Sequence, residues 1–138
     1  MDRLIVAAKL EALRRCVARV ETRRGVSAEA LKTDPDRQDI VSLNLTRAVQ
    51  LCVDLATHVL ARTEQPTPTT MGETFTLLAA EGLIEDGLAA RLRAAVGFRN
   101  VAVHTYQRID WEIVHRISHE GLDDFRAFAE SIERSTAG

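Results

Sequence analysis

Residues 34–60 read DPDRQDIVSLNLTRAVQLCVDLATHVL, and this stretch decides the fold. Its opening pair, Asp34 and Pro35, is typical of a helix start. The carboxylate can cap free backbone N–H groups, and proline at the first helical position has no N–H to leave unpaired. Apolar residues then recur at alternating steps of four and three, which places them on one side of a helix: Val41, Leu45, Ala48, Cys52, Leu55 and Val59. We therefore expect one long central helix.

The residues before this stretch repeat the same pattern. Apolar residues again recur at steps of four and three, in a run that predicts a first amphipathic helix: Val6, Leu10, Leu13, Val17 and Val20. Gly25 is placed to end this helix, and residues 23–33 are polar enough to be a connection.

The residues after the central stretch begin with a break, because proline disfavours helix at itself and at the residue before it. Residues 65–69, QPTPT, are therefore a loop. Thr70 with Glu73 is a capping-box signature, which opens a short helix that Gly82 can end. A longer helix follows from Glu85 or Asp86, with Gly97 in its interior, and its buried side carries Leu88, Leu92, Val96 and Val103.

Asp110 can cap a last helix, whose apolar stripe is Val114, Ile117, Phe125, Phe128 and Ile132. Four long helices and one short one, joined by compact connections, predict an all-α fold. The natural architecture is an antiparallel four-helix bundle that forms a single domain over residues 1–138.

Composition narrows the class of protein. No apolar run approaches the roughly 20 residues of a membrane span, and the first residues lack the plan of a signal peptide, so we expect a cytoplasmic protein. Cys16 and Cys52 have no zinc-finger spacing and are interpreted as buried small hydrophobes. The net charge is −2, yet residues 1–24 hold seven basic and three acidic residues. That segment is either a phosphate-binding surface or an ordinary solvated helix face.

The functional signal lies in residues 97–106, GFRNVAVHTY, which contain the pattern R-x4-H-x-Y at Arg99, His104 and Tyr106. Arginine offers a permanently charged fork for phosphate, histidine titrates near neutrality, and tyrosine carries a hydroxyl that can be modified. The combination indicates phosphodiester chemistry. Singly, the three residues also suit a helix surface, a helix cap and a packing contact.

This pattern resembles the HepT-like proteins of the HEPN superfamily. The resemblance extends to the downstream Ile109-Asp110-Trp111 and to the upstream run LLAAEGLI at residues 77–84. It implies a HEPN-like helical fold and a metal-independent endoribonuclease that is the toxin of a toxin–antitoxin pair. The partner would be a minimal nucleotidyltransferase, the MntA-like antitoxin, which modifies Tyr106 with AMP. The resemblance also implies a homodimer with its two motifs facing each other in a cleft, and a larger hetero-oligomer with the antitoxin is compatible with it.

The expected chemistry assigns one role to each motif residue. His104 is the acid–base group that takes the proton of a ribose 2′-hydroxyl, and Arg99 holds the scissile phosphate and stabilises its transition state. Asn100 adds a neutral hydrogen bond to substrate. No carboxylate cluster near the motif suits magnesium, so cleavage without metal or other cofactor, leaving a 2′,3′-cyclic phosphate, is the consistent reaction.

Helix geometry leaves two arrangements open. On a continuous helix Arg99 and His104 would project roughly 140° apart, which prevents them from sharing one phosphate. Either the helix ends between them, or two copies of the motif meet at a symmetric interface. Gly97 would help two such helices approach each other.

Several other residues are weaker candidates. Asp54 falls near one face of the central helix with Arg47 and His58, where it is either part of a polar stripe or a support for the motif from across the bundle. His115 and His119 have metal-ligand spacing but no third ligand and are interpreted as surface residues. Trp111 either anchors the core or stacks on a base. The alternative function is a HEPN-like module that binds nucleotide or protein without catalysis.

Overall fold

The computed structural model describes residues 2–137, and all regular secondary structure in this range is helical, with no strand. Its elements are α1 (Arg3–Arg23), α2 (Ala28–Lys32), α3 (Pro35–Leu60), α4 (Met71–Ala80), α5 (Asp86–His104), the 3₁₀ helix η1 (Tyr106–Arg108) and α6 (Trp111–Thr136). The all-α fold expected from the sequence is confirmed.

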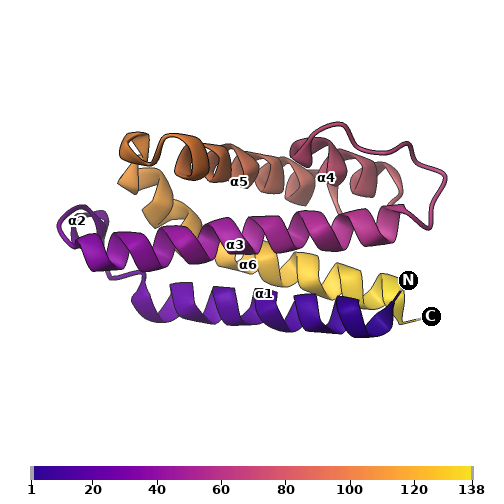
Figure 1. Ribbon diagram of the computed structural model, residues 1–138, viewed down its shortest axis with the longest axis horizontal. Helices are drawn as coiled ribbons and strands as arrows, with labels where there is room; N and C mark the ends of the chain where they lie inside the picture. Colours follow the sequence, from indigo (N-terminus) through magenta and orange to yellow (C-terminus); the bar gives the residue numbers. More distant parts are fainter. Residues whose placement is uncertain (1, 138) are drawn as a thin grey trace.

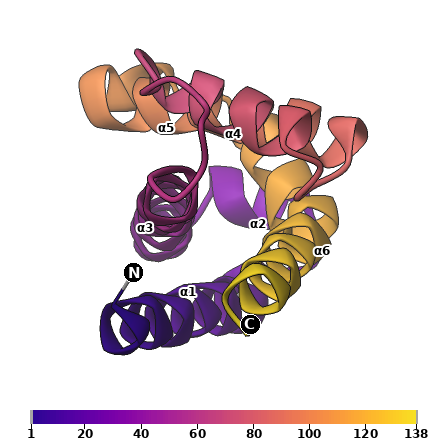
Figure 2. The same ribbon diagram turned by 90° about the vertical axis from the view of Figure 1, so that its right-hand side faces the viewer.

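The four long helices run alternately in opposite directions. Figure 1 shows α1 and α5 running one way and α3 and α6 the other, so that the chain turns at each end of the molecule. In the end view of Figure 2, α1, α3, α5 and α6 surround a common centre, with α4 lying beside α5. This is the antiparallel bundle that the four apolar stripes predict.

The helix starts follow the capping residues that the sequence indicates. The backbone N–H of Arg37 donates to the Asp34 carboxylate at 3.2 Å, and the backbone N–H of Glu73 donates to the Thr70 hydroxyl at 3.1 Å. Asp110 accepts from the backbone N–H of Glu112 at 2.9 Å. These contacts confirm the predicted starts of α3, α4 and α6, because each cap satisfies a donor that the first turn leaves free.

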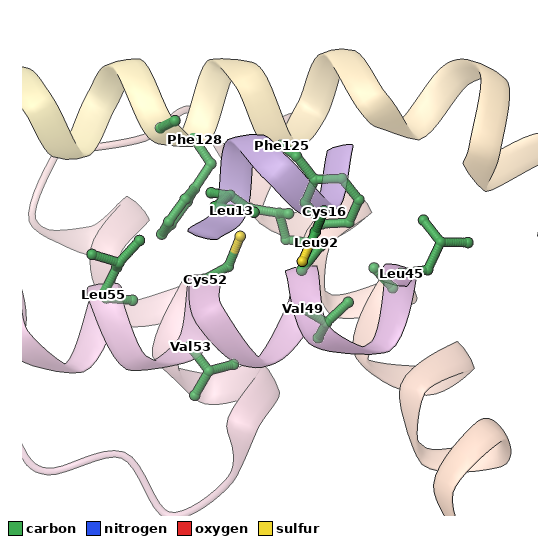
Figure 3. Packing of buried hydrophobic residues seen from close by; sticks show 14 of the residues in the cluster. Leu13, Cys16, Leu45, Val49, Cys52, Val53, Leu55, Leu92, Phe125 and Phe128 are labelled. Atoms are coloured by element: carbon green, nitrogen blue, oxygen red, sulfur yellow. The ribbon is translucent and has the colours of Figure 1, made fainter. Parts of the chain in front are cut away.

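The core lies where the stripes of the long helices meet (Figure 3). Phe75 and Phe128 pack edge to face, with ring centroids 5.9 Å apart. Cys16 and Cys52 are free and buried, as expected. Burying each large aliphatic or aromatic side chain contributes about 1.5–3 kcal/mol, so the pooled stripes of the helices stabilise the bundle.

The segment at residues 23–33 differs from the expected connection, because it contains α2. Ser27 caps this helix by accepting from the backbone N–H of Ala30 at 3.3 Å, and Leu31 is fully buried. Five residues are too few to reveal a helical period in the sequence. The bundle therefore carries two short α-helices, α2 and α4, where one was predicted.

No helix in residues 2–137 combines the length and the apolar character that crossing a membrane requires.

Candidate active site

Helix α5 carries the motif and runs without a break from Asp86 to His104. Thr105 then leaves the helix with φ −144° and ψ 61°, while its N–H still donates to the carbonyl of Val101. The helix therefore ends after His104 and not between His104 and Arg99. Of the two arrangements left open by the sequence, the one with an early helix end is wrong.

Arg99 lies on the side of α5 that faces the bundle. It follows the buried residues Leu88, Leu92 and Val96 at steps of four, four and three, so it continues their stripe. Its Nε is shielded from solvent and has no hydrogen-bond partner in residues 2–137. Nη1 donates to the Asn100 side chain at 3.1 Å. The guanidinium is thus half-buried and makes no ion pair within the described chain.

His104 lies on the outer side of α5 and is exposed. Five residues of helix separate it from Arg99, which turns the two side chains roughly 140° apart. One chain therefore does not bring the arginine and the histidine to a single phosphate. Gly97 lies seven residues before His104 on the same helix. The two residues therefore point to the outer side of α5 in directions that differ by only about 20°.

Tyr106 points back from η1 to the start of α3. Its hydroxyl donates to the Asp39 carboxylate at 2.7 Å, and the Ser42 hydroxyl donates to the Tyr106 oxygen at 3.5 Å. Its ring meets Trp111 edge to face, with centroids 6.0 Å apart. Trp111 is partly buried against the core and contacts the motif through this ring, so it serves as a packing anchor.

The environment of Tyr106 favours its neutral phenol. Burial makes the largest contribution to the raised pKa of Tyr106, and the hydrogen bond and negative charge of Asp39 add to it, while Ser42 acts in the opposite direction. The side chain is still 40% exposed. Its hydroxyl is therefore a protonated group that a reagent in solution can reach.

Asp54 does not support the motif. Its carboxylate accepts from Lys9 Nζ at 3.2 Å and from Gln50 Nε2 at 3.1 Å. The motif meets α3 at Asp39, and Asp54 lies 15 residues further along that helix, or about 22 Å. Asp54 belongs to a polar contact between α1 and α3, so of its two interpretations the structure favours the polar stripe over support for Arg99 or His104.

The rings of His115 and His119 contact each other at a tilt of 50°, with centroids 4.3 Å apart. His119 Nε2 lies 3.2 Å from the Gly25 carbonyl oxygen. His119 therefore joins α6 to the turn after α1. Among residues 2–137, no three His, Cys, Asp or Glu side chains gather in a metal-binding arrangement.

Asp39 and Ser42 are the site residues that sequence reasoning missed. The contact between Asp39 and Tyr106 joins positions 67 residues apart. A single sequence carries no signal for such a pair, because both residues suit an exposed helix surface equally well.

Comparison with known protein families matches residues 10–132 to the family described as "Ribonuclease HepT-like". The chain belongs to the HepT-like ribonuclease family. A curated relative, the mRNA nuclease HepT of Shewanella oneidensis, is 35% identical over 129 residues, covering 94% of this chain and 96% of the relative. The family resemblance inferred from the R-x4-H-x-Y pattern is confirmed.

Solved structures that include a HEPN toxin and a toxin–antitoxin pair share the fold. A tri-AMPylated Shewanella oneidensis HEPN toxin in complex with MNT antitoxin superposes with a TM-score of 0.88 at 34% identity, covering 97% of this chain and 99% of that one. A toxin–antitoxin structure with AMP-PNP matches with the same TM-score and identity, covering 94% and 98% of the two chains. The cytosolic protein YutE of Bacillus subtilis, of unknown function, has a TM-score of 0.83 at 12% identity over 96% of this chain and 89% of its own, which shows a common fold alone.

Proposed function

We propose that this HepT-like ribonuclease is a metal-independent endoribonuclease toxin whose site is completed by two copies of the chain, and that AMP attached to Tyr106 inhibits it. The observation that carries the proposal is the unbroken helix α5. It presents a half-buried guanidinium without an ion pair and an exposed imidazole on different sides.

In the proposed reaction His104 takes the proton from a ribose 2′-hydroxyl, and the freed oxygen attacks the adjacent phosphorus. The bond from phosphorus to the 5′-oxygen breaks, and the departing oxygen takes a proton from water, which leaves a 2′,3′-cyclic phosphate and a 5′-hydroxyl. Arg99 holds two phosphate oxygens and stabilises the charge that develops in the transition state, since its planar fork matches that geometry. Asn100, hydrogen-bonded to Arg99 at 3.1 Å, orients the guanidinium and adds a neutral contact to substrate.

The outer face of α5 supports the dimer. A Cβ atom added at Gly97 would meet nothing within 4 Å, so no packing inside the chain requires glycine there. A groove of about 410 Å³ beside it is lined largely by apolar residues of α5 and α6, including Gly97, Val101 and Ile113. Val103, which the sequence places wrongly on the buried side of this helix, is exposed, and with the exposed Ile113 it adds apolar surface at the same end of the molecule. This apolar surface is where we place the second copy, whose contact would have to combine the Arg99 of one chain with the His104 of the other.

The proposed inhibition rests on the position of Tyr106. The Shewanella oneidensis toxin is described as tri-AMPylated and in complex with an MNT antitoxin, and we propose the same kind of partner for this chain. Adenylation would replace the phenolic proton with a bulky, negatively charged group two residues from His104. That group would compete with RNA phosphate for Arg99, because a phosphate ester pairs readily with a guanidinium.

The test is RNA cleavage by purified protein in the presence of a chelator, with products analysed for 2′,3′-cyclic phosphate. Wild type should cut, whereas Arg99→Ala and His104→Ala should each lower the rate by at least about 10²-fold. Their helicity and melting temperature should stay close to wild type, because neither side chain belongs to the apolar core. Cleavage that appears only after a divalent ion is added would contradict the mechanism.

The variant Tyr106→Phe tests the proposed inhibition by AMP attached to Tyr106. The variant keeps the ring but lacks the hydroxyl, so it should still cut RNA and should gain no mass when it is incubated with the antitoxin and ATP. An undiminished AMP adduct on Tyr106→Phe would place the modification on another residue.

A further inference from the structure

A second groove lies between α1 and α3, further along α3 than the Tyr106 contact. It has a volume of about 540 Å³, and we refer to it as the α1–α3 groove. Its walls carry Ala12, Arg15, Cys16, Arg19, Asn44, Arg47, Gln50 and Leu51. Both views show α1 and α3 side by side along their length (Figures 1 and 2).

The α1–α3 groove concentrates positive charge without compensation. Arg15, Arg19 and Arg47 are exposed, and none makes an ion pair within residues 2–137. No carboxylate lines the groove. The nearby Asp54 is already held by Lys9 and Gln50.

The other side of α1 provides an internal comparison. There, in the groove between α1 and α6, Arg14 pairs with Glu133, and Arg126 pairs with Glu21 at 2.8 Å. Arginines on one side of α1 are thus matched by acids, whereas those on the other side are not. Like charges left together repel each other and contribute nothing to folding, so the contrast points to an anionic ligand on the α3 side.

Arginines from both helices line the groove together with Cys16. The positive charges of Arg47 and Arg15 both act to lower the pKa of the Cys16 thiol, although burial is stronger and raises it overall. Arg15 and Arg19 are one turn apart on α1, which sets their Cβ atoms about 6 Å apart. Two guanidiniums in a row with a third facing them suit consecutive phosphates better than a single small anion.

Helix α3 connects this groove to the motif. Asp39, which holds Tyr106, lies eight residues before Arg47. Eight residues correspond to about 12 Å along the helix and a turn of about 80°. Both residues are exposed, so a strand leaving the motif could follow the open side of α3 into the groove.

We propose that the α1–α3 groove binds the sugar–phosphate backbone of the RNA that the motif cuts, a few nucleotides from the scissile phosphate, through Arg15, Arg19 and Arg47. The proposal rests on the proposed ribonuclease function. No aromatic side chain lines the groove, so it offers no stacking platform for bases. Its contribution is therefore independent of sequence, as phosphate contacts position a strand without reading it.

The experiment measures binding of a fluorescein-labelled, single-stranded, 2′-O-methyl oligonucleotide of mixed sequence by anisotropy across a range of salt concentrations. The 2′-O-methyl groups block cleavage. The double variant Arg15→Gln/Arg47→Gln should bind at least about tenfold more weakly at low salt. The slope of log K against log salt should become shallower by about 1.4, because each phosphate contact in a single strand contributes about 0.7.

The matched control is Arg14→Gln/Arg126→Gln, which removes the same charge from the ion-paired side of α1. It should change the slope by much less than the groove variant. Both double variants should cut the dinucleotide UpA at the wild-type rate, because so short a substrate does not reach the groove.

Four results would overturn the proposal. An unchanged salt slope in the groove variant, with wild type binding and cutting RNA, would refute the groove and leave the ribonuclease function intact. Equal losses in both double variants would mean that only net charge matters. If the groove variant bound RNA normally but no longer bound the antitoxin, the groove would be an interface for a protein. Wild type that neither binds RNA nor cuts UpA would refute the ribonuclease function itself.

Discussion

The hydroxyl of Tyr106 donates a 2.7 Å hydrogen bond to the carboxylate of Asp39, which joins the end of the motif to the first turns of α3. The contact gives the phenolic proton a defined acceptor. If the Tyr106 oxygen attacks the α-phosphorus of ATP, that proton can pass to Asp39 while pyrophosphate leaves.

Asp39→Asn should therefore slow the transfer of AMP to Tyr106. The amide keeps the shape of the side chain but is a poor proton acceptor, and loss of a general base typically costs about 10²-fold or more. Intact-mass measurement over time with antitoxin and ATP would follow the reaction. RNA cleavage by the unmodified variant should stay near wild type. A variant modified as fast as wild type would show that Asp39 takes no part in proton transfer.

Mixing two inactive variants should restore activity if the site is shared. In a two-fold dimer containing one Arg99→Ala chain and one His104→Ala chain, one site keeps both residues and the other keeps neither. Random mixing would make half of the dimers mixed, so up to about a quarter of wild-type activity should return. Cleavage assays before and after subunit exchange provide the measurement. No recovery, despite exchange shown by native mass spectrometry, would place the whole site in one chain.

Gly97 should respond oppositely to small and large substitutions. Gly97→Ala meets open space and improves helix propensity, so it should stabilise the isolated chain by up to about 1 kcal/mol. Gly97→Trp should weaken both self-association and RNA cleavage, because the bulky ring would lie on the outer face of α5. Light scattering and thermal melts distinguish the two effects. A Trp variant that still self-associates and cuts RNA would move the interface away from this face.

Histidine protonation should weaken the fold below neutral pH. Burial contributes most to the lowered pKa of His119, followed by the positive charges of Arg24 and His115, while the Gly25 carbonyl opposes them. The folded chain therefore resists protonation at His119 more than the unfolded chain does. This stabilisation is present above the ordinary histidine pKa of about 6.5 and is lost as the pH falls through the lowered folded value.

Urea unfolding at about pH 7.5 and about pH 5.5 brackets that window. Wild type should lose stability on acidification, and His119→Gln should lose less, since glutamine cannot take up the proton. Equal losses in the two proteins would assign the pH dependence to other groups.

The parts of the fold that the sequence predicts are those set by local chemistry. Asp34, Thr70 and Asp110 each cap a helix through a backbone N–H two or three residues away. The apolar stripes are also local, because the spacing of apolar residues along one helix predicts which side of that helix is buried. In contrast, α2 is only five residues long, and its order depends on Leu31 reaching the core from a polar segment.

The candidate site was predictable only in part. The motif gave Arg99, His104 and Tyr106, and helical spacing gave their angular separation. That Arg99 is half-buried, and that Asp54 contacts Lys9 and not the motif, depends on how whole helices are placed against each other. The same holds for the pairing of Tyr106 with Asp39.

The unbroken course of α5 from Arg99 to His104 also has a consequence for dosage. A nuclease assembled within one chain gains activity in proportion to the number of chains. A nuclease whose arginine and histidine come from different chains is active only as a dimer. While most chains are monomers, mass action makes the number of dimers, and therefore the activity, rise with the square of the number of chains. Halving the supply of free chain would then remove about three quarters of the damage to RNA. If the site is shared as proposed, a cell that produces a slight excess of this protein over its antitoxin would be spared, and one that produces a large excess would not.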